Sequence, residues 1–414
     1  MIPLGHVFKE LFTERTRVLL TILAIAWGTA SITTMLALGE GLRLTFSRSG
    51  KGMGEDILIA WPGQTSKPYG GLPEGHPVPL NAEDLNQIRA SIPEIGGISG
   101  EYRHYAGMRY GDNLRTGRLM GVHPAYGPMR NIILEQGSRF IDPIDTAQRR
   151  RVAVIGPQVA EELFGEGIDP VGLQIAIEGR PFTVVGLMKK KYQMSTYGGP
   201  DRDGTWIPIS TFETIYNRRH YNNLVVKPHD RSDMEYVKTR MREVIANRHG
   251  CDPTDEEITN NWDTSEGKDI AIGILYGLQA MLGIIGGLTL IVAGVGIANV
   301  MYVSVSNATR DIGIRMAVGA RSYQVLSQYV LEALGATAIG GLLGIAASQL
   351  VVWIVEQVPM DGEFFEFVGR PVPVLSLQVA LIVVAVLGII GFLAGFFPAR
   401  KAAQVDPAEA LRYE

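Results

Sequence analysis

Several common signatures are missing from this sequence. It has one cysteine in 414 residues, Cys251, so no disulfide can form within the chain. It has no G-x-x-x-x-G-K-[ST], G-x-G-x-x-G or H-E-x-x-H motif. Its net charge of −4 lacks the basic excess that binds nucleic acid. These absences predict a chain that is not itself an enzyme, holds no metal and has no nucleic-acid partner.

Charged residues are rare in four long apolar stretches. None occurs from Val18 to Gly39 or between Asp269 and Arg310. About 20 apolar residues suffice to cross a bilayer. The sequence therefore predicts transmembrane helices at 18–40, 270–304, 322–355 and 373–398. The first is too long for a typical cleaved signal peptide, and no A-x-A site follows it closely, which favours an uncleaved anchor. The second would be about 50 Å long against a hydrocarbon core of ~30 Å, so its excess is predicted to form a stalk.

Residues 41–269 form a long polar block and are predicted to fold as an extracytoplasmic domain. Strand–helix–strand patterns at its two ends predict an α/β subdomain from 53–107 plus 221–264, with a β-rich subdomain, 108–220, inserted between them. The predicted fold is an α-helical membrane protein with four transmembrane helices and a large α+β extracytoplasmic domain between helices 1 and 2.

Local patterns within this block predict individual elements. Asn81 with Asp84, and Ser232 with Glu235, have the spacing of capping boxes at helix starts. A hairpin is expected around 111–113. Pro208 within a short strand predicts that this strand lies at a sheet edge.

The short segments between the apolar stretches differ in charge. Basic residues occur in the N-terminus 1–17 (Lys9, Arg15, Arg17), in 305–321 (Arg310, Arg315, Arg321) and in 399–414 (Arg400, Lys401, Arg412). The loop 356–372 instead has four acidic residues and one basic residue. Because positive short loops stay in the cytoplasm, both termini and 305–321 are predicted to be cytoplasmic, and 41–269 and 356–372 to lie outside.

The segment 305–321 is short, charged and amphipathic. Ala308, Ile312, Met316 and Gly319 share one helical stripe, which could rest on a protein groove or on lipid headgroups. Asp311 and Arg315 are spaced as an i,i+4 ion pair. Gly319 suits the position just after a helix, and Ser322 suits the next N-cap. Two interpretations stay open: a contact that receives force from another protein, and an interfacial helix held by snorkelling arginines.

Small residues recur at four-residue spacing in the apolar segments, a pattern that lets helix backbones approach closely in lipid. The positions are Ala24 and Gly28, Gly283 and Gly287, Gly340 and Gly344, and Gly391 and Gly395. Packing within one subunit and packing across a dimer explain this pattern equally well.

Four blocks of sequence resemble one family. They are RTRVLLTILAIAWGTASITTMLALGEG at 15–41, RVAVIGPQVAEELFG with DPVGLQIAIEGRPFTVVGL at 151–187, IVAGVGIANVMYVSVSNATRDIGIRMAVGARSYQVLSQYVLEALG at 291–335 and FFPARKAAQVDPAEALRYE at 396–414. In this order they resemble the MacB/FtsX-like permeases of ABC transporters, which include macrolide exporters and lipoprotein-releasing permeases.

The resemblance implies a multi-pass protein of the bacterial cytoplasmic (inner) membrane, in contact with lipid. It implies a permease homo- or heterodimer that works with cytoplasmic ABC ATPase subunits, and a periplasmic adaptor as a further candidate partner. ATP-driven motion would be transmitted to the outer domain to export or release a lipoprotein, peptide or amphiphile. The alternative is an FtsX-like signalling subunit that regulates a periplasmic or cell-wall partner without moving cargo.

Within this resemblance, the segment TRDIGIRMAVGAR matches the family's coupling helix. The ATPase contact would then include Arg310, Asp311, Ile312, Gly313, Arg315, Gly319 and Ala320. Some members fuse the ATPase to the permease, but these residues hold no Walker A motif, so a separate subunit is expected to bind ATP and Mg²⁺. The resemblance does not determine the cargo, the direction of movement, the type of dimer or the use of an adaptor and outer-membrane channel.

Overall fold

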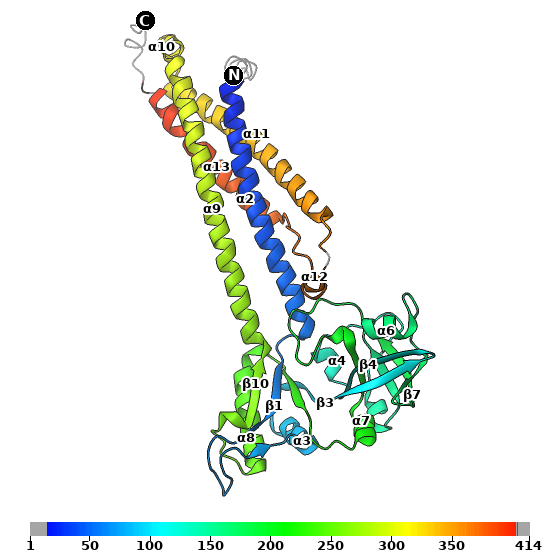
Figure 1. Ribbon diagram of the computed structural model, residues 1–414. Coiled ribbons are helices and arrows are strands. Elements are labelled where there is room, and N and C mark those ends of the chain that lie inside the picture. The colour runs from blue at the N-terminus through cyan, green and yellow to red at the C-terminus, as the bar shows by residue number, and fades with distance from the viewer. Residues whose placement is uncertain (1–14, 361, 403, 405–414) are drawn as a thin grey trace. The chain divides into compact units, whose positions relative to one another are not determined.

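A computed structural model describes residues 15–360, 362–402 and 404. The chain divides into two compact units (Figure 1). One comprises the chain up to Thr45, Ile272–Asp361 and the chain from Arg370 onward, and the other comprises Phe46–Ala271 and Gly362–Gly369. Most of the predicted N-terminal segment 1–17 and C-terminal segment 399–414 lies outside the described residues.

Four helices of the described chain are long and apolar enough to cross a membrane. They are α2 (Arg15–Gly50), α9 (Thr264–Asn307), α11 (Ser322–Gln357) and α13 (Leu377–Ala402). The predicted fold class, with four such helices and an α+β domain between the first two, is confirmed. With 44 residues, α9 is about 66 Å long, more than twice the ~30 Å hydrocarbon core.

The helix ends differ from the sequence-based boundaries. α2 continues past residue 40, and Glu40 forms an ion pair of 2.7 Å with Arg43 on the same helix. α9 extends to Asn307 and so includes the first residues of the segment predicted as 305–321. α13 begins at Leu377 rather than at 373, because Ser376 caps it: the backbone N–H of Val379 donates to Ser376 Oγ at 3.3 Å.

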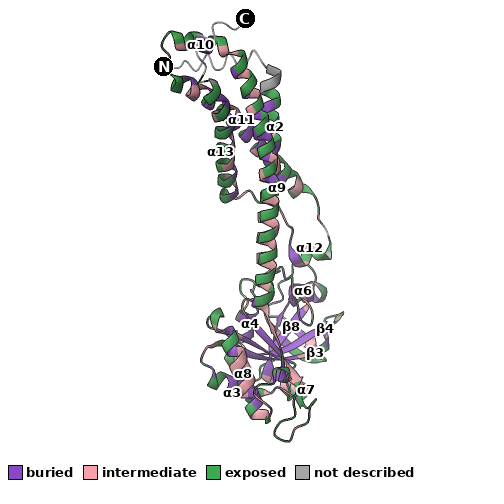
Figure 2. Ribbon diagram, turned by 90° about the vertical axis from the view of Figure 1, so that its left-hand side faces the viewer, coloured by how far each residue is buried: buried purple, intermediate pink, exposed green. Residues whose placement is uncertain are grey.

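One apolar core joins all four spanning helices. It includes Ile25 and Ile32 of α2, Leu290 and Ile297 of α9, Tyr329 and Ala333 of α11, and Val383 and Leu387 of α13. Between 22% and 39% of the most apolar window of each helix is buried (Figure 2). The remaining apolar side chains are half-buried or exposed, and the exposed ones suit contact with lipid or with another membrane helix.

The second unit is built on one sheet of ten strands. The strands are β1 (Leu58–Gln64), β2 (Pro77–Val78), β3 (Ile95–Tyr110), β4 (Asn113–Val122), β5 (Val152–Ile155), β6 (Gln174–Ile177), β7 (Arg180–Leu187), β8 (Gly204–Pro208), β9 (Asn223–Pro228) and β10 (Thr259–Asp263). Their order is β10-β1-β9-β3-β4-β8-β5-β7-β6, and β2 pairs with β1. β3 is 16 residues long, pairs with β9 at its start and with β4 further along, and so connects the two halves of the sheet.

Successive side chains of each strand point to opposite faces of the sheet, and a hydrophobic core lies on each face. Leu58 and Ala60 of β1 belong to one core, and Ile59 belongs to the other. The helices α3 (Ala82–Ser91), α6 (Pro157–Phe164), α7 (Ile209–Tyr216) and α8 (Met234–His249) contribute to the first core. The short α4 (Tyr126–Met129) contributes to the second. Two further short helices belong to this unit, α5 (Pro143–Ala147) and α12 (Glu363–Val368).

Several local predictions can be compared with this domain. The Asn81–Asp84 capping box and the hairpin around 111–113 are confirmed. The Ser232–Glu235 box is wrong, because Asp230 caps a preceding 3₁₀ turn and α8 starts only at Met234. The edge position of the Pro208 strand is also wrong. β8 lies between β4 and β5, but its pairing with β5 ends at Trp206, so Pro208 pairs with β4 alone and is locally at an edge.

Candidate functional site

The segment between the second and third spanning helices contains a short helix of its own, α10 (Thr309–Ala317). Gly319 follows it with φ +106°, a conformation that favours glycine just after a helix end. The prediction for Ser322 is wrong by one position. Arg321 is the N-cap of α11, and its backbone N–H donates to Gln324 Oε1 at 3.0 Å.

One face of α10 packs against its own chain. Ile312 is 3% exposed, Gly313 is buried, and Ala308 and Met316 pack against the core that Ile312 joins. That core includes Val325 and Tyr329 of α11. The apolar stripe predicted to rest on a protein groove or on lipid headgroups therefore rests mainly on the neighbouring helix. This packing fixes which residues of α10 remain available to a partner.

The opposite face of α10 is open. Of the predicted contact residues, Arg310, Asp311, Arg315 and Gly319 are exposed, and Ala320 is half-buried. Arg315 Nη1 donates to Gln328 Oε1 at 3.3 Å, which replaces the predicted pair with Asp311.

Two apolar residues of this open face were not among the predicted contacts. They are Ile314, 44% exposed, and Val318, 85% exposed. The helical period was a usable signal, because Ile314 lies about 200° around the helix from the inward-facing Ile312.

Two of the small-residue pairs lie at tight helix crossings within the chain. A Cβ on Gly340 would come within 2.7 Å of Ile25, and one on Gly344 within 2.6 Å of the carbonyl oxygen of Ala26. Gly391 and Gly395 approach α11 in the same way, with a Cβ falling 2.6 Å from Thr337 and from Ala333. These pairs let α11 contact α2 and α13 within one subunit.

The other pairs lie in looser surroundings. A Cβ on Gly28 would be 3.3 Å from Leu290, and one on Gly283 would be 3.7 Å from Leu36. Gly287 has open space beside it, and Ala24 is exposed. The close contact on this stretch of α9 is made instead by Gly286, where a Cβ would lie 2.6 Å from Ile32.

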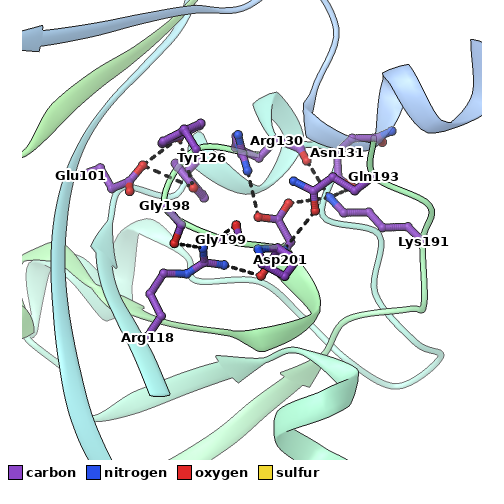
Figure 3. A network of polar contacts seen from close by, with 12 residues as sticks. Glu101, Arg118, Tyr126, Arg130, Asn131, Lys191, Gln193, Gly198, Gly199 and Asp201 are labelled. Carbon is purple, nitrogen blue, oxygen red and sulfur yellow. Dashed lines mark hydrogen bonds and ion pairs between the residues drawn. The ribbon is translucent and has the colours of Figure 1, made fainter. Parts of the chain in front are cut away.

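A buried cluster of charged and aromatic side chains lies on the α4 face of the sheet (Figure 3). This polar cluster comprises Glu101, Arg118, Tyr126, Arg130, Lys191, Gln193, Tyr197 and Asp201. Sequence reasoning missed it, because its members come from β3, β4, α4 and the loop after β7, and charged side chains are seldom fully buried.

Asp201 is the anionic centre of the polar cluster. It is 1% exposed, and its carboxylate accepts from Arg130 Nη2 at 2.8 Å and contacts Lys191 Nζ at 2.9 Å. Burial alone would raise the pKa of Asp201, but the charges of Arg130 and Lys191 outweigh it and lower the pKa to about 2. Burial lowers the pKa of Lys191, an effect that Asp201 partly offsets. Asp201 and its two cations thus each favour the charged form of the other.

The polar cluster fixes an irregular stretch of chain, residues 189–203, which we name the clamped loop. Arg118 donates to the carbonyl oxygens of Gly198, Gly199 and Pro200. The backbone N–H of Asp201 donates to the Gln193 side chain at 3.0 Å. Tyr197 donates to Glu101 Oε2 at 2.7 Å, and the Arg130 guanidinium lies 4.5 Å from the Tyr197 ring. Such contacts suit a structural clamp rather than a reaction centre.

Comparison with known proteins agrees with this architecture. Residues 18–244 match the family described as the MacB-like periplasmic core domain, and residues 283–407 match the FtsX-like permease C-terminal family. The first match alone covers more than half of the chain.

Full-length relatives and solved structures are similar to this chain. It is 30% identical to the macrolide export ATP-binding/permease protein MacB of Neisseria meningitidis over 97% of this chain and 59% of that protein. It is 32% identical to MacB of Marinobacter nauticus over 98% of this chain and 60% of that protein. The chain thus spans about 60% of the length of these relatives and matches their permease part.

Two solved outer domains are each 18% identical to this chain. The match to the periplasmic region of MacB from Actinobacillus actinomycetemcomitans covers 53% of this chain and 94% of that structure, with a TM-score of 0.42. The match to the extracellular domain of the transporter YknZ covers 50% of this chain and 100% of that structure, with a TM-score of 0.41. From the two family matches, this chain belongs to the MacB/FtsX-like family of ABC transporter permeases and is an inner-membrane protein with a periplasmic domain.

Proposed function

We propose that this chain is a permease subunit that transmits ATP-driven motion to its periplasmic domain, where a lipoprotein, peptide or amphiphile is exported or released. The observation that carries the proposal is the geometry of α10. Its inward face is fixed to α11 through Ile312, while Arg310, Asp311, Ile314 and Arg315 are exposed. A helix held by its own bundle and open on its other face can receive a push from a partner and pass it to the spanning helices.

The partner in this proposal is a cytoplasmic ABC ATPase, which binds ATP and Mg²⁺ outside these 414 residues. Both termini and α10 lie in the cytoplasm, and a second permease completes a dimer within the lipid. The basic residues of the short segments support this orientation. The names of the relatives, which combine ATP-binding and permease functions, support an ATPase partner.

Binding of the cognate ABC ATPase tests the proposal. Arg310→Glu plus Arg315→Glu reverses two exposed charges on α10, and the expected result is a loss of affinity of at least about tenfold for nanodisc-embedded chain. Arg109→Glu plus Arg240→Glu, in the periplasmic domain, makes the same change in net charge and should bind like wild type. Equal binding by all three proteins would refute the role of α10.

A further inference from the structure

The loop between the third and fourth spanning helices contributes a short helix, α12 (Glu363–Val368), to the periplasmic unit. This helix docks on the clamped loop defined above. The backbone N–H of Gln193 donates to the Phe367 carbonyl oxygen at 2.7 Å. Arg202 Nη1 contacts Glu366 Oε2 at 2.5 Å, and its guanidinium lies 4.5 Å from the Phe367 ring. Val368 is 6% exposed, so the end of α12 is buried.

The clamped loop also binds the end of the first spanning helix. Met194 donates its backbone N–H to the carbonyl oxygen of Ser49, near the C-terminus of α2, at 3.2 Å. Just beyond α2, Gly52 passes so close to the Tyr192 carbonyl that a Cβ would lie 2.0 Å from its oxygen. A single loop therefore contacts the continuation of the first spanning helix and the connection between the third and fourth.

The chain that follows α12 returns to α2. Val374 donates its backbone N–H to the Ala37 carbonyl oxygen at 2.9 Å, and Thr45 Oγ1 donates to the Arg370 carbonyl oxygen at 3.2 Å. A Cβ on Gly41 would lie 2.0 Å from the Val372 carbonyl oxygen, so the two backbones touch. The chain after α12 is thus bound to α2, and α12 is itself bound to a loop that contacts the end of α2.

A loop used in this way must resist deformation, and the polar cluster provides that resistance. Irregular loops of about 15 residues are uncommon in compact domains unless they have a function. Here Arg118 binds the carbonyl oxygens of Gly198, Gly199 and Pro200 toward the end of the loop. Lys191, near its start, donates to the carbonyl oxygens of Arg130 and Asn131, and Asp201 contacts both Lys191 and Arg130. Displacing the loop would separate buried charges from their partners, which is costly.

We infer that the clamped loop is the receiving contact of the periplasmic domain, and that α12 is a second mechanical input to it beside α2. This inference rests on the proposed function, because the motion to be received is the ATP-driven movement of the spanning helices. Arg202, Glu366 and Phe367 form the contact through which α12 acts. Gln193 links that contact to the polar cluster, since its backbone binds α12 and its side chain binds Asp201.

Hydrogen exchange of the full chain in nanodiscs tests whether α12 holds the loop at rest. In Arg202→Glu, the amide of Gln193 is expected to exchange at least about tenfold faster than in wild type. The charge swap Arg202→Glu plus Glu366→Arg should restore protection. Arg240→Glu, which removes an ion pair with Glu243 on α8, is the matched control and should leave the loop unchanged. Unaltered Gln193 exchange in Arg202→Glu would overturn the docking contact.

The same measurement with the ATPase bound tests transmission. Wild-type chain should show a change in the exchange of residues 189–203 between the nucleotide-free complex and the complex with a non-hydrolysable ATP analogue. Arg202→Glu should lose most of this change and the charge swap should regain it. A wild-type complex that binds the ATPase but shows no change in 189–203 overturns this inference and leaves the proposed function standing. A wild-type chain that binds no ATPase overturns the proposed function, and this inference with it.

Discussion

At the scale of single residues, Asp201 is the buried anion that pairs with two cations of the polar cluster. Replacing it with asparagine would leave Arg130 and Lys191 buried without their anion. Breaking a buried pair in this way costs about 3–5 kcal/mol. We therefore expect Asp201→Asn to lower the unfolding free energy by that amount. The measurement is chemical unfolding of the full chain in detergent, followed by tryptophan fluorescence, since Trp61 and Trp206 lie in or against the same core.

Asp112→Asn is the control for this substitution, because Asp112 is exposed in the turn between β3 and β4. A loss below about 1 kcal/mol in Asp201→Asn would contradict the role of the polar cluster. The pH dependence has a definite sign. The pKa of Asp201 is lowered from 3.8 to about 2, so its stabilising contribution is complete above pH 3.8 and is lost as the pH falls toward 2.

Sequence reasoning could not find the polar cluster at this scale. Arg118, Arg130 and Lys191 look like ordinary surface charges in the sequence, because their burial depends on strand pairings between distant segments. Asn81 and Gly319 were predictable, since a helix cap depends on a few neighbouring residues. The failure at Ser232 has the same local origin, because Asp230 competes for the cap two residues earlier.

At the scale of elements, Gly344 of α11 lies at a tight helix crossing, whereas Gly287 of α9 has open space beside it. Gly344→Ala would place a methyl group 2.5 Å from Thr29 Cβ at the crossing of α11 and α2. Overpacking of this kind costs about 1–3 kcal/mol. We expect Gly344→Ala to lower the thermal midpoint of the full chain in detergent, and Gly287→Ala, with open space beside it, to leave it unchanged. Equal midpoints would contradict the packing of α11 on α2.

The two isoleucines of α10 should have opposite effects. Ile312→Ala removes a buried side chain and should destabilise the chain by about 2–4 kcal/mol. Ile314→Ala should change stability by less than about 0.5 kcal/mol and should weaken ATPase binding by roughly tenfold, because Ile314 is exposed on the open face. Thermal melting and a binding titration on the same two variants separate these effects. If both variants bind the ATPase as wild type does, a partner contact on this face is contradicted.

Helices were easier to predict than strands for a physical reason. A spanning helix is defined by its own composition, so all four were evident from runs of apolar residues. β8 depends on neighbours far away in the sequence, and its proline suggested an edge strand although it pairs on both sides. α12 escaped notice because a segment of six residues is too short to show a helical period.

At the scale of the whole molecule, the sequence predicted two subdomains outside the membrane, and the structure has one continuous sheet running through both predicted regions. β3 is responsible, because its 16 residues cross the predicted boundary at 107–108. The order of spanning helices and domain was predictable from composition. The connection of α12 to the clamped loop was not, since it joins segments about 165 residues apart.

The central claim is that α10 couples ATP hydrolysis by a partner to movement of this chain. ATPase activity of the complex reconstituted in nanodiscs tests it most directly. Wild-type chain is expected to raise the hydrolysis rate of the ATPase above that of the ATPase alone, and Arg310→Glu plus Arg315→Glu to return it to that level, with thermal stability unchanged. An unchanged rate in the double variant, with the protein folded in the membrane, would contradict the claim and identify α10 as an interfacial anchor.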